Sequence, residues 1–153
     1  NKTEVATILG NEQWMWLEKT LKIKADVVIL ISSIQVLPTE HGYEKWSLFP
    51  NEMKRLIANI KNINARTIII SGDRHKAAIY NDNNLFEVTS SSMNRPIKAN
   101  VIMRADETDA LMVGKVFNKE NYGLLVIDSK LKTLQMSIKN IDGNVVSSVD
   151  LKL

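Results

Sequence analysis

The stretch Thr67–His75, with the sequence TIIISGDRH, decides the fold. Its unbroken run of β-branched residues predicts a strand that is covered on both faces, as in a parallel sheet. The run ends at Gly72, and a carboxylate, a guanidinium and an imidazole follow it. In open parallel sheets the ligand site lies beyond the carboxyl ends of the strands. The stretch therefore predicts an α/β protein whose chemistry lies at this end of a sheet.

Asp73 and His75 stand two residues apart after this strand. If the backbone stays extended beyond Gly72, their side chains point to one side while Arg74 turns away. An oxygen ligand and a nitrogen ligand on one side suit a divalent or trivalent metal ion. An ordinary turn, with Asp73 bonded to its own backbone and His75 in solvent, fits the same residues. The spacing alone leaves both interpretations open.

Length and composition narrow the class of protein. A chain of 153 residues, 44% of them hydrophobic and 24% charged, is long enough for one compact domain with a core. The 20 basic residues are scattered among 17 acidic ones, so no nucleic-acid partner is expected. The absence of Cys excludes disulfides and thiolate metal sites. No apolar run reaches about 18 residues, so we expect no membrane segment in this chain.

A second apolar run, Ala25–Ile31, also predicts an interior parallel strand, and it ends at polar residues as the first run does. Two neighbouring strands are therefore expected to open into one crevice. Between them, residues 50–64 have apolar positions at helical spacing behind Pro50. Strand, helix and strand make a βαβ unit. Ahead of this unit, Trp14, Leu17 and Leu21 predict the buried stripe of another helix.

The loop Leu37–Phe49 is rich in large and ionisable residues and follows a strand end directly. His41, next to Glu40, is a candidate to shuttle a proton or hold a leaving group, and Tyr43 and Trp46 are candidates to wall the site. A packed surface loop pinned by its aromatic residues explains the pattern equally well.

The second half of the chain has a different character. A short strand at Leu85–Val88 leads into a Ser-rich tract at residues 89–96, which fits a solvated loop or the lining of an anion site. Residues 97–120 have no clean period and predict a long excursion. From Asn121 onward, three apolar segments separated by turn signals predict an antiparallel β-meander.

Five segments, taken together and in order, resemble the carboxyl-terminal half of the PhoD-like alkaline phosphatase/phosphodiesterase family. They are residues 9–17 (LGNEQWMWL), 32–46 (SSIQVLPTEHGYEKW), 71–75 (SGDRH), 89–91 (TSS) and 121–125 (NYGLL). The resemblance implies an α/β, calcineurin-like metallophosphoesterase fold, in which two β-sheets pack together and helices flank them. Residues 1–153 would form the carboxyl-terminal part of a single such domain.

The resemblance also implies an activity, the hydrolysis of phosphate monoesters or diesters at a two-metal centre. In that chemistry, divalent or trivalent ions of the Fe, Ca, Zn or Mn type clamp the phosphoryl oxygens, and a metal-bound hydroxide attacks in line. Residues 72–75 resemble the family's last metal motif, which implies that Asp73 and His75 are metal ligands. Arg74 and His41 become the candidate catalytic and phosphate-binding residues, and Asn121 a further substrate-binding residue. A pair between Arg74 and a carboxylate is the alternative.

The resemblance places the remaining metal ligands in the amino-terminal half of the domain, outside the matching segments. The chain has only two His, and two protein ligands cannot hold a pair of ions. We therefore expect half an active site, inactive without the missing amino-terminal half. That half and a phosphate ester are the expected partners. The alternative is an inactive remnant that serves as a binding or structural module. The resemblance alone favours a periplasmic or secreted location. Without its complement, the sheet is expected to expose an unpaired edge and an apolar face.

Overall fold

The computed structural model describes residues 6–96 and 107–153. In this part of the chain the elements follow one another as α1 (Gly10–Thr20), β1 (Val27–Ser32), the 3₁₀ helix η1 (Trp46–Leu48), α2 (Pro50–Lys61), β2 (Arg66–Ser71), β3 (Ala77–Asp82), β4 (Leu85–Ser90), β5 (Met112–Phe117), β6 (Asn121–Asp128), β7 (Thr133–Asn140) and β8 (Val145–Lys152). No helix of the described residues is both long and apolar enough to cross a membrane.

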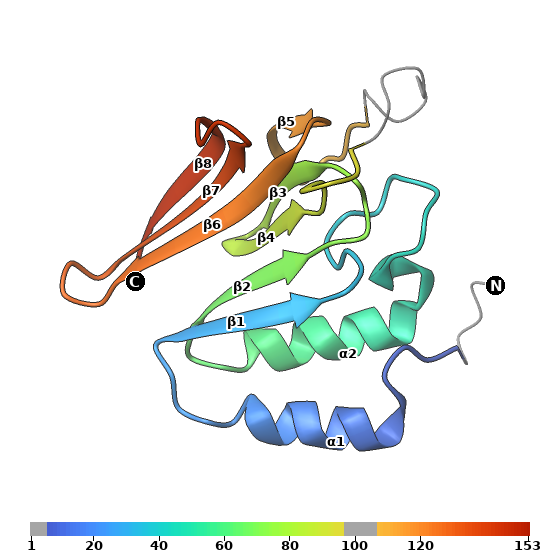
Figure 1. Ribbon diagram of the computed structural model, residues 1–153. Helices are drawn as coiled ribbons and strands as arrows, with labels where there is room; N and C mark the ends of the chain where they lie inside the picture. Colours follow the sequence, from blue (N-terminus) through green and yellow to red (C-terminus); the bar gives the residue numbers. More distant parts are fainter. Residues whose placement is uncertain (1–5, 97–106) are drawn as a thin grey trace.

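The strands form two sheets that pack face to face (Figure 1). The larger has the order β1-β2-β4-β3-β5, with β1, β2 and β4 parallel and β3 antiparallel to both of its neighbours. The smaller is the meander β6-β7-β8. Both helices lie on the face of the larger sheet that is remote from the meander. The predicted α/β fold of two sheets flanked by helices is confirmed.

The helices form because their apolar residues repeat at helical spacing. In α1, Trp14 and Leu17 are buried while Trp16 is 60% exposed, so the two Trp divide between core and surface. The indole of Trp14 donates to Glu52 in the first turn of α2, with nitrogen to oxygen distances of 2.8 and 2.9 Å. This bond holds α1 against α2 beneath the sheet.

Alternation along β2 divides the core into two layers. Ile69 packs with the helices, whereas Ile68 packs with the meander. The two sheets approach closely at Gly123 of β6, where a Cβ would lie 3.4 Å from the Cβ of Ser90. Any larger residue at this position would press against β4.

Two predictions from the sequence need correction. β1 is parallel to β2 but forms an edge of its sheet rather than its interior, and Ile29 and Ile31 are 42% and 79% exposed. The predicted excursion contains strand β5, which pairs with β3, while its residues 97–106 lie outside the described part.

Candidate metal and substrate site

The carboxyl ends of β1, β2 and β4 meet at Gly72. A Cβ at this position would lie 3.6 Å from the carbonyl oxygen of Ser33 and 3.8 Å from the Cβ of Ser91. These two residues directly follow β1 and β4. The strand ends therefore open into one region, as the sequence predicts for β1 and β2.

The backbone after Gly72 forms a turn instead of continuing as a strand. Asp73 and His75 have φ angles of 63° and 54°, in the left-handed region that non-glycine residues seldom adopt. The premise that the chain stays extended here is therefore wrong. Backbone strain of this kind costs about 1–3 kcal/mol per residue and clusters at functional sites. Two such residues beside a strand end mark this turn as a candidate site.

The hydrogen bond of His75 determines which ring nitrogen is available. Its Nδ1 lies 2.8 Å from the carbonyl oxygen of Arg95. A carbonyl can only accept, so Nδ1 donates, and in the neutral form of the ring Nε2 has the free lone pair. Metal-binding His residues are commonly oriented in this way. The carboxylate of Asp73 is exposed and makes no hydrogen bond with the described residues. Both side chains fit the role of ligand.

Two donors are only part of a metal centre. Within residues 6–96 and 107–153, no group of three or more His, Asp or Glu side chains could hold an ion. A catalytic zinc ion usually has three protein ligands, and a pair of ions needs more. Asp73 and His75 therefore fit such a centre only if further ligands reach the turn.

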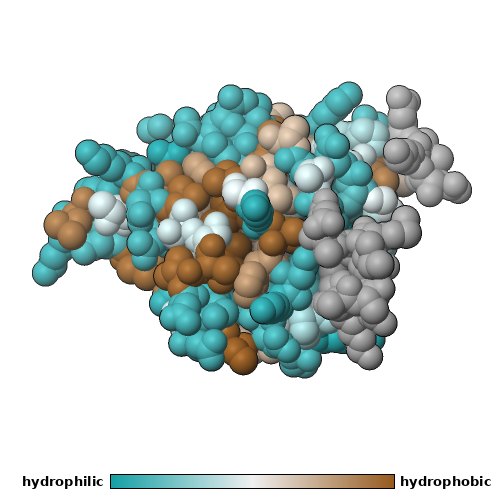
Figure 2. Space-filling view, turned by 90° about the horizontal axis from the view of Figure 1, so that it is seen from above, coloured by the Kyte–Doolittle hydropathy of each residue, from teal (hydrophilic) through white to brown (hydrophobic). Residues whose placement is uncertain are grey.

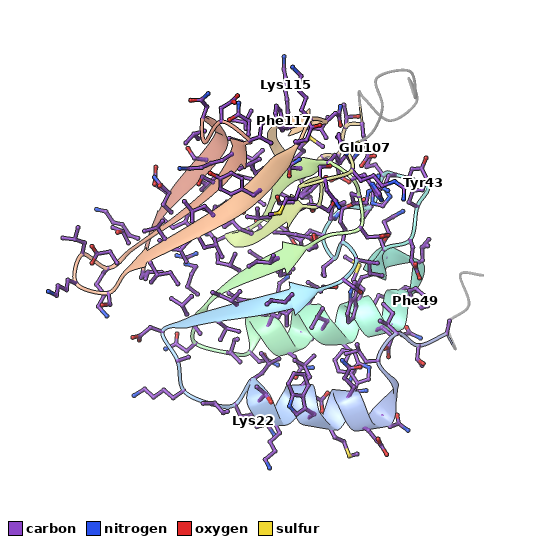
Figure 3. The ribbon with its side chains drawn as sticks, in the orientation of Figure 1. Lys22, Tyr43, Phe49, Glu107, Lys115 and Phe117 are labelled. Carbon is purple, nitrogen blue, oxygen red and sulfur yellow. The ribbon has the colours of Figure 1, made fainter. Side chains whose placement is uncertain are left out.

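Arg74, between them, points into the protein and is 7% exposed. Its Nη2 lies 2.6 Å from Oε2 of Glu107, and Lys76 pairs with the same oxygen. Its guanidinium carbon also lies 4.5 Å from the centre of the Tyr43 ring. Figure 3 shows Tyr43 and Glu107 near each other at this end of the sheet. The alternative predicted for Arg74, a pair with a carboxylate, is present.

His41 reaches the same cluster through Tyr43. The two rings stack with their centres 6.1 Å apart, and Nδ1 of His41 accepts from the backbone nitrogen of Tyr43 at 3.2 Å. Nε2 therefore carries the hydrogen, and it is buried without a partner among the described residues. Burial, followed by the positive charge of Arg74, lowers the pKa of His41 to about 4. His41 is thus a neutral hydrogen-bond donor at pH 7.

The rest of the 37–49 loop is packed rather than open. Trp46 is 4% exposed, lies edge to face with Trp14 at 6.4 Å and donates to Ser32 Oγ at 3.0 Å. Lys45 donates to the carbonyl oxygen of His41. Of the two aromatic residues predicted to wall the site, Tyr43 borders it and Trp46 belongs to the core. The loop is pinned by its aromatic residues.

Glu87 is a buried residue that sequence analysis missed. It lies in β4 and is fully buried, and its carboxylate accepts from the backbone nitrogens of Val36 and Leu37 at 3.1 and 2.6 Å. It also accepts from Ser71 Oγ at 2.5 Å. Burial raises the pKa of Glu87 against the opposing effect of these donors. The available signal was a single charge between Phe86 and Val88 in an otherwise uncharged strand.

A second hydrogen-bonded group continues this network. Nε2 of Gln35 donates to Thr89 Oγ1 at 2.8 Å and to the Tyr80 hydroxyl at 3.2 Å. Thr89 Oγ1 also lies 2.8 Å from Ser71 Oγ. Residues 35–37, which lead into the loop of His41, are thereby fixed to β2, β3 and β4.

Asn121 is buried, and both the oxygen and the nitrogen of its side-chain amide make hydrogen bonds within the protein. Its Oδ1 accepts from Ser90 Oγ at 2.8 Å, and its Nδ2 donates to the carbonyl oxygen of Lys119 at 2.7 Å. These bonds join the end of β4 to the start of β6. Its role in binding substrate stays a prediction.

Comparisons with known proteins identify the fold. No protein-family model matches the sequence, and no curated protein matches it. Among solved structures, one described as PhoD superimposes on 97% of this chain with a TM-score of 0.71 at 16% identity. A second, GAP50, described as the anchor in the inner membrane complex of Plasmodium, superimposes on 93% with a TM-score of 0.73 at 14% identity. The chain spans 33% and 42% of these two proteins.

Proposed function

Because the chain has part of a PhoD-like metallophosphoesterase fold, we propose that it is one part of a metal-dependent enzyme that hydrolyses phosphate monoesters or diesters. The observation that carries the proposal is the turn after β2. It combines an exposed carboxylate at Asp73 with an imidazole at His75 whose Nδ1 is held by a carbonyl. When bound, two metal ions would clamp the phosphoryl oxygens and lower the pKa of an attacking water.

Some residues of this chain would bind the metal ions, and others would bind the ester. Asp73 would supply oxygen and His75 would supply Nε2. The remaining ligands would come from the amino-terminal half of the same domain, outside this chain. Arg74 and Lys76 both pair with the carboxylate of Glu107. Two cations gathered at one place among the described residues favour a phosphate anion near the cluster.

His41 would act on the leaving group as a neutral donor rather than as a charged acid. Its pKa of about 4 leaves the ring uncharged at pH 7, with a hydrogen on Nε2. A hydrogen bond from this nitrogen would stabilise negative charge that develops on the leaving oxygen. To bind the ester, Arg74 would exchange part of its bond to Glu107 for one to phosphate. Asn121 would act as a further substrate contact.

The test is the metal content and phosphatase activity of the intact protein before and after Asp73→Asn. The proposal predicts a loss of bound metal and at least about a 100-fold loss of activity, as expected when a ligand of a catalytic metal is removed. Asp26→Asn is the matched control because this exposed carboxylate precedes β1, at the other end of the sheet. Equal metal content and rates in wild type, D73N and D26N would remove Asp73 from the mechanism.

A second candidate function is a catalytically inactive binding or structural module. The observation that favours it is the lack of three gathered metal-ligand side chains in residues 6–96 and 107–153. One of the matching structures, GAP50, is described as an anchor. An intact protein that carries no metal and hydrolyses neither monoesters nor diesters would support this alternative.

A further inference from the structure

The end of the molecule opposite the candidate site is formed by four turns. They are residues 21–26 between α1 and β1, 62–65 between α2 and β2, 83–84 between β3 and β4, and 129–132 between β6 and β7. They gather at the amino ends of the parallel strands, at the left in Figure 1. Together they contain four Lys and a single acidic residue, Asp26. We call these four turns the basic end.

The turn between β6 and β7 presents an apolar side chain between two Lys. Lys130, Leu131 and Lys132 are all exposed, Leu131 to 73%. The carboxylate of Asp128 accepts from the backbone nitrogens of Lys130 and Leu131 at 2.9 and 2.8 Å. The carbonyl oxygen of Lys132 accepts from the backbone nitrogen of Leu153 at 2.8 Å. These bonds hold the turn in one shape, with its apolar side chain in solvent.

The turn between α1 and β1 repeats this arrangement. Lys22, Ile23 and Lys24 are exposed, Ile23 to 69%. The backbone nitrogen of Ile23 donates to the carbonyl oxygen of Thr20 at 3.1 Å, so this turn continues the last turn of the helix. Figure 3 shows Lys22 extending away from α1. Two turns from distant parts of the chain thus share one pattern, an exposed aliphatic residue flanked by two Lys.

These two turns are neighbours in space. Nζ of Lys132 lies 3.8 Å from Oδ2 of Asp26, which joins the turn between β6 and β7 to the turn between α1 and β1. A crevice of about 570 Å³ opens beside this pair, and its lining includes two further cations, Lys61 and Arg66. Figure 2, seen from above, shows hydrophobic atoms between hydrophilic ones where the turn between β6 and β7 projects at the left. The basic end therefore combines gathered cations with projecting apolar groups.

From these features we propose that the basic end docks on a membrane surface that contains anionic lipids. The Lys side chains would contact lipid phosphates, because a negatively charged leaflet attracts cations that lie within a Debye length of it. Ile23 and Leu131 would enter the headgroup layer, where their apolar surface is removed from water. The flanking Lys residues suit this position, since their stems can lie along apolar material while their ammonium groups stay in water.

The aliphatic residues favour a membrane over a nucleic acid as the partner. Nucleic acids bind Lys through their phosphates and stack their bases on aromatic side chains, so they would leave Ile23 and Leu131 without a role. Docking at the basic end would also leave the carboxyl ends of β1, β2 and β4 facing away from the membrane. The candidate site would then stay open to solution. This inference does not depend on hydrolysis, because an inactive module could bind a membrane in the same way.

The test is cosedimentation of the intact protein with phosphatidylcholine vesicles that contain about 30% phosphatidylglycerol. We expect a partition coefficient at least about 10-fold higher than with pure phosphatidylcholine. Replacing both Lys130 and Lys132 by Gln should lower it at least about 10-fold, because each Lys at an anionic surface contributes about fivefold. The matched control replaces Lys115 and Lys119 by Gln. Both are exposed on or after β5, away from the basic end, and their loss should change binding by less than about twofold.

A second variant tests the apolar contacts with the charge unchanged. Replacing both Ile23 and Leu131 by Ser should lower partition into the anionic vesicles at least about fivefold, because their burial in the headgroup layer is lost. Both residues are exposed, so the fold should persist. Wild-type binding by either the lysine variant or the serine variant would overturn the proposal. So would an intact protein that binds duplex DNA but not these vesicles, since a nucleic acid would then be the partner.

Discussion

Two carboxylates lie near the carboxyl ends of the strands, and they are stabilised in different ways. Glu87 accepts hydrogen bonds from two backbone nitrogens and a hydroxyl. Glu107 faces the cations of Arg74 and Lys76. Neutral donors fix Glu87 as part of the framework, whereas exchangeable ion pairs hold Glu107 beside the candidate site. The difference separates a rigid support from a charged cluster that an anion could enter.

The largest effect is expected at Glu87. Glu87→Ala would leave Val36 N and Leu37 N buried without an acceptor, and Ser71 Oγ would keep only Thr89 Oγ1 as a partner. At about 1–3 kcal/mol for each unsatisfied group, we expect a loss of about 4 kcal/mol of unfolding free energy. Urea denaturation measures this loss. Ser71→Ala removes one of the donors and should cost about 1 kcal/mol; equal losses in both variants would show that Glu87 does not hold the loop.

A smaller effect is expected at Glu107. Glu107→Gln would remove the carboxylate that pairs with the buried cations of Arg74 and Lys76, and we expect a loss of about 3 kcal/mol. Adding Lys76→Met to this variant should recover more than about 1 kcal/mol, because one of the two buried cations that Glu107 faced is removed. The double-mutant cycle by urea denaturation measures this coupling. Strictly additive losses would mean that the three charges act independently.

The smallest effect is expected from the pH dependence that His41 creates. Its pKa is about 4 in the folded protein and near 6.5 when unfolded, so the unfolded chain binds more protons between these values. His41 therefore contributes stability at neutral pH that is lost as the pH falls from about 6.5 to about 4, on the order of 2 kcal/mol. His41→Gln should flatten the plot of unfolding free energy against pH in this window. An unchanged slope would show that burial and the neighbouring cations do not lower the pKa of His41.

Periodicity accounts for the parts of the fold that were predicted correctly. The apolar spacing in α1 and α2, and the runs in β1, β2 and the meander, are determined locally. β5 was missed because Gly114 and Lys115 interrupt its apolar pattern. β1 was predicted to be interior because its sequence is apolar on both faces, but among the described residues it forms an edge of its sheet.

The candidate site was harder to predict, because its geometry depends on backbone torsions and long-range partners. Sequence spacing could not reveal that Asp73 and His75 adopt left-handed conformations, or that Arg74 turns inward to Glu107. Glu87 and Lys76 were missed because charged residues are seldom fully buried without a partner. Their partners are distant in sequence, so only the folded chain brings them together.

The close approach of the two sheets at Gly123 links the meander, through β4, to the turn after β2. A methyl group there would come into van der Waals contact with Ser90, which bonds Asn121. The next residue, Ser91, accepts from the backbone nitrogen of Arg74 at 3.0 Å. A displacement of β4 by a few tenths of an ångström would thus be passed to the peptide between Asp73 and Arg74. The contact at Gly123 thus connects the opposite sheet to the strand end that positions the proposed ligands.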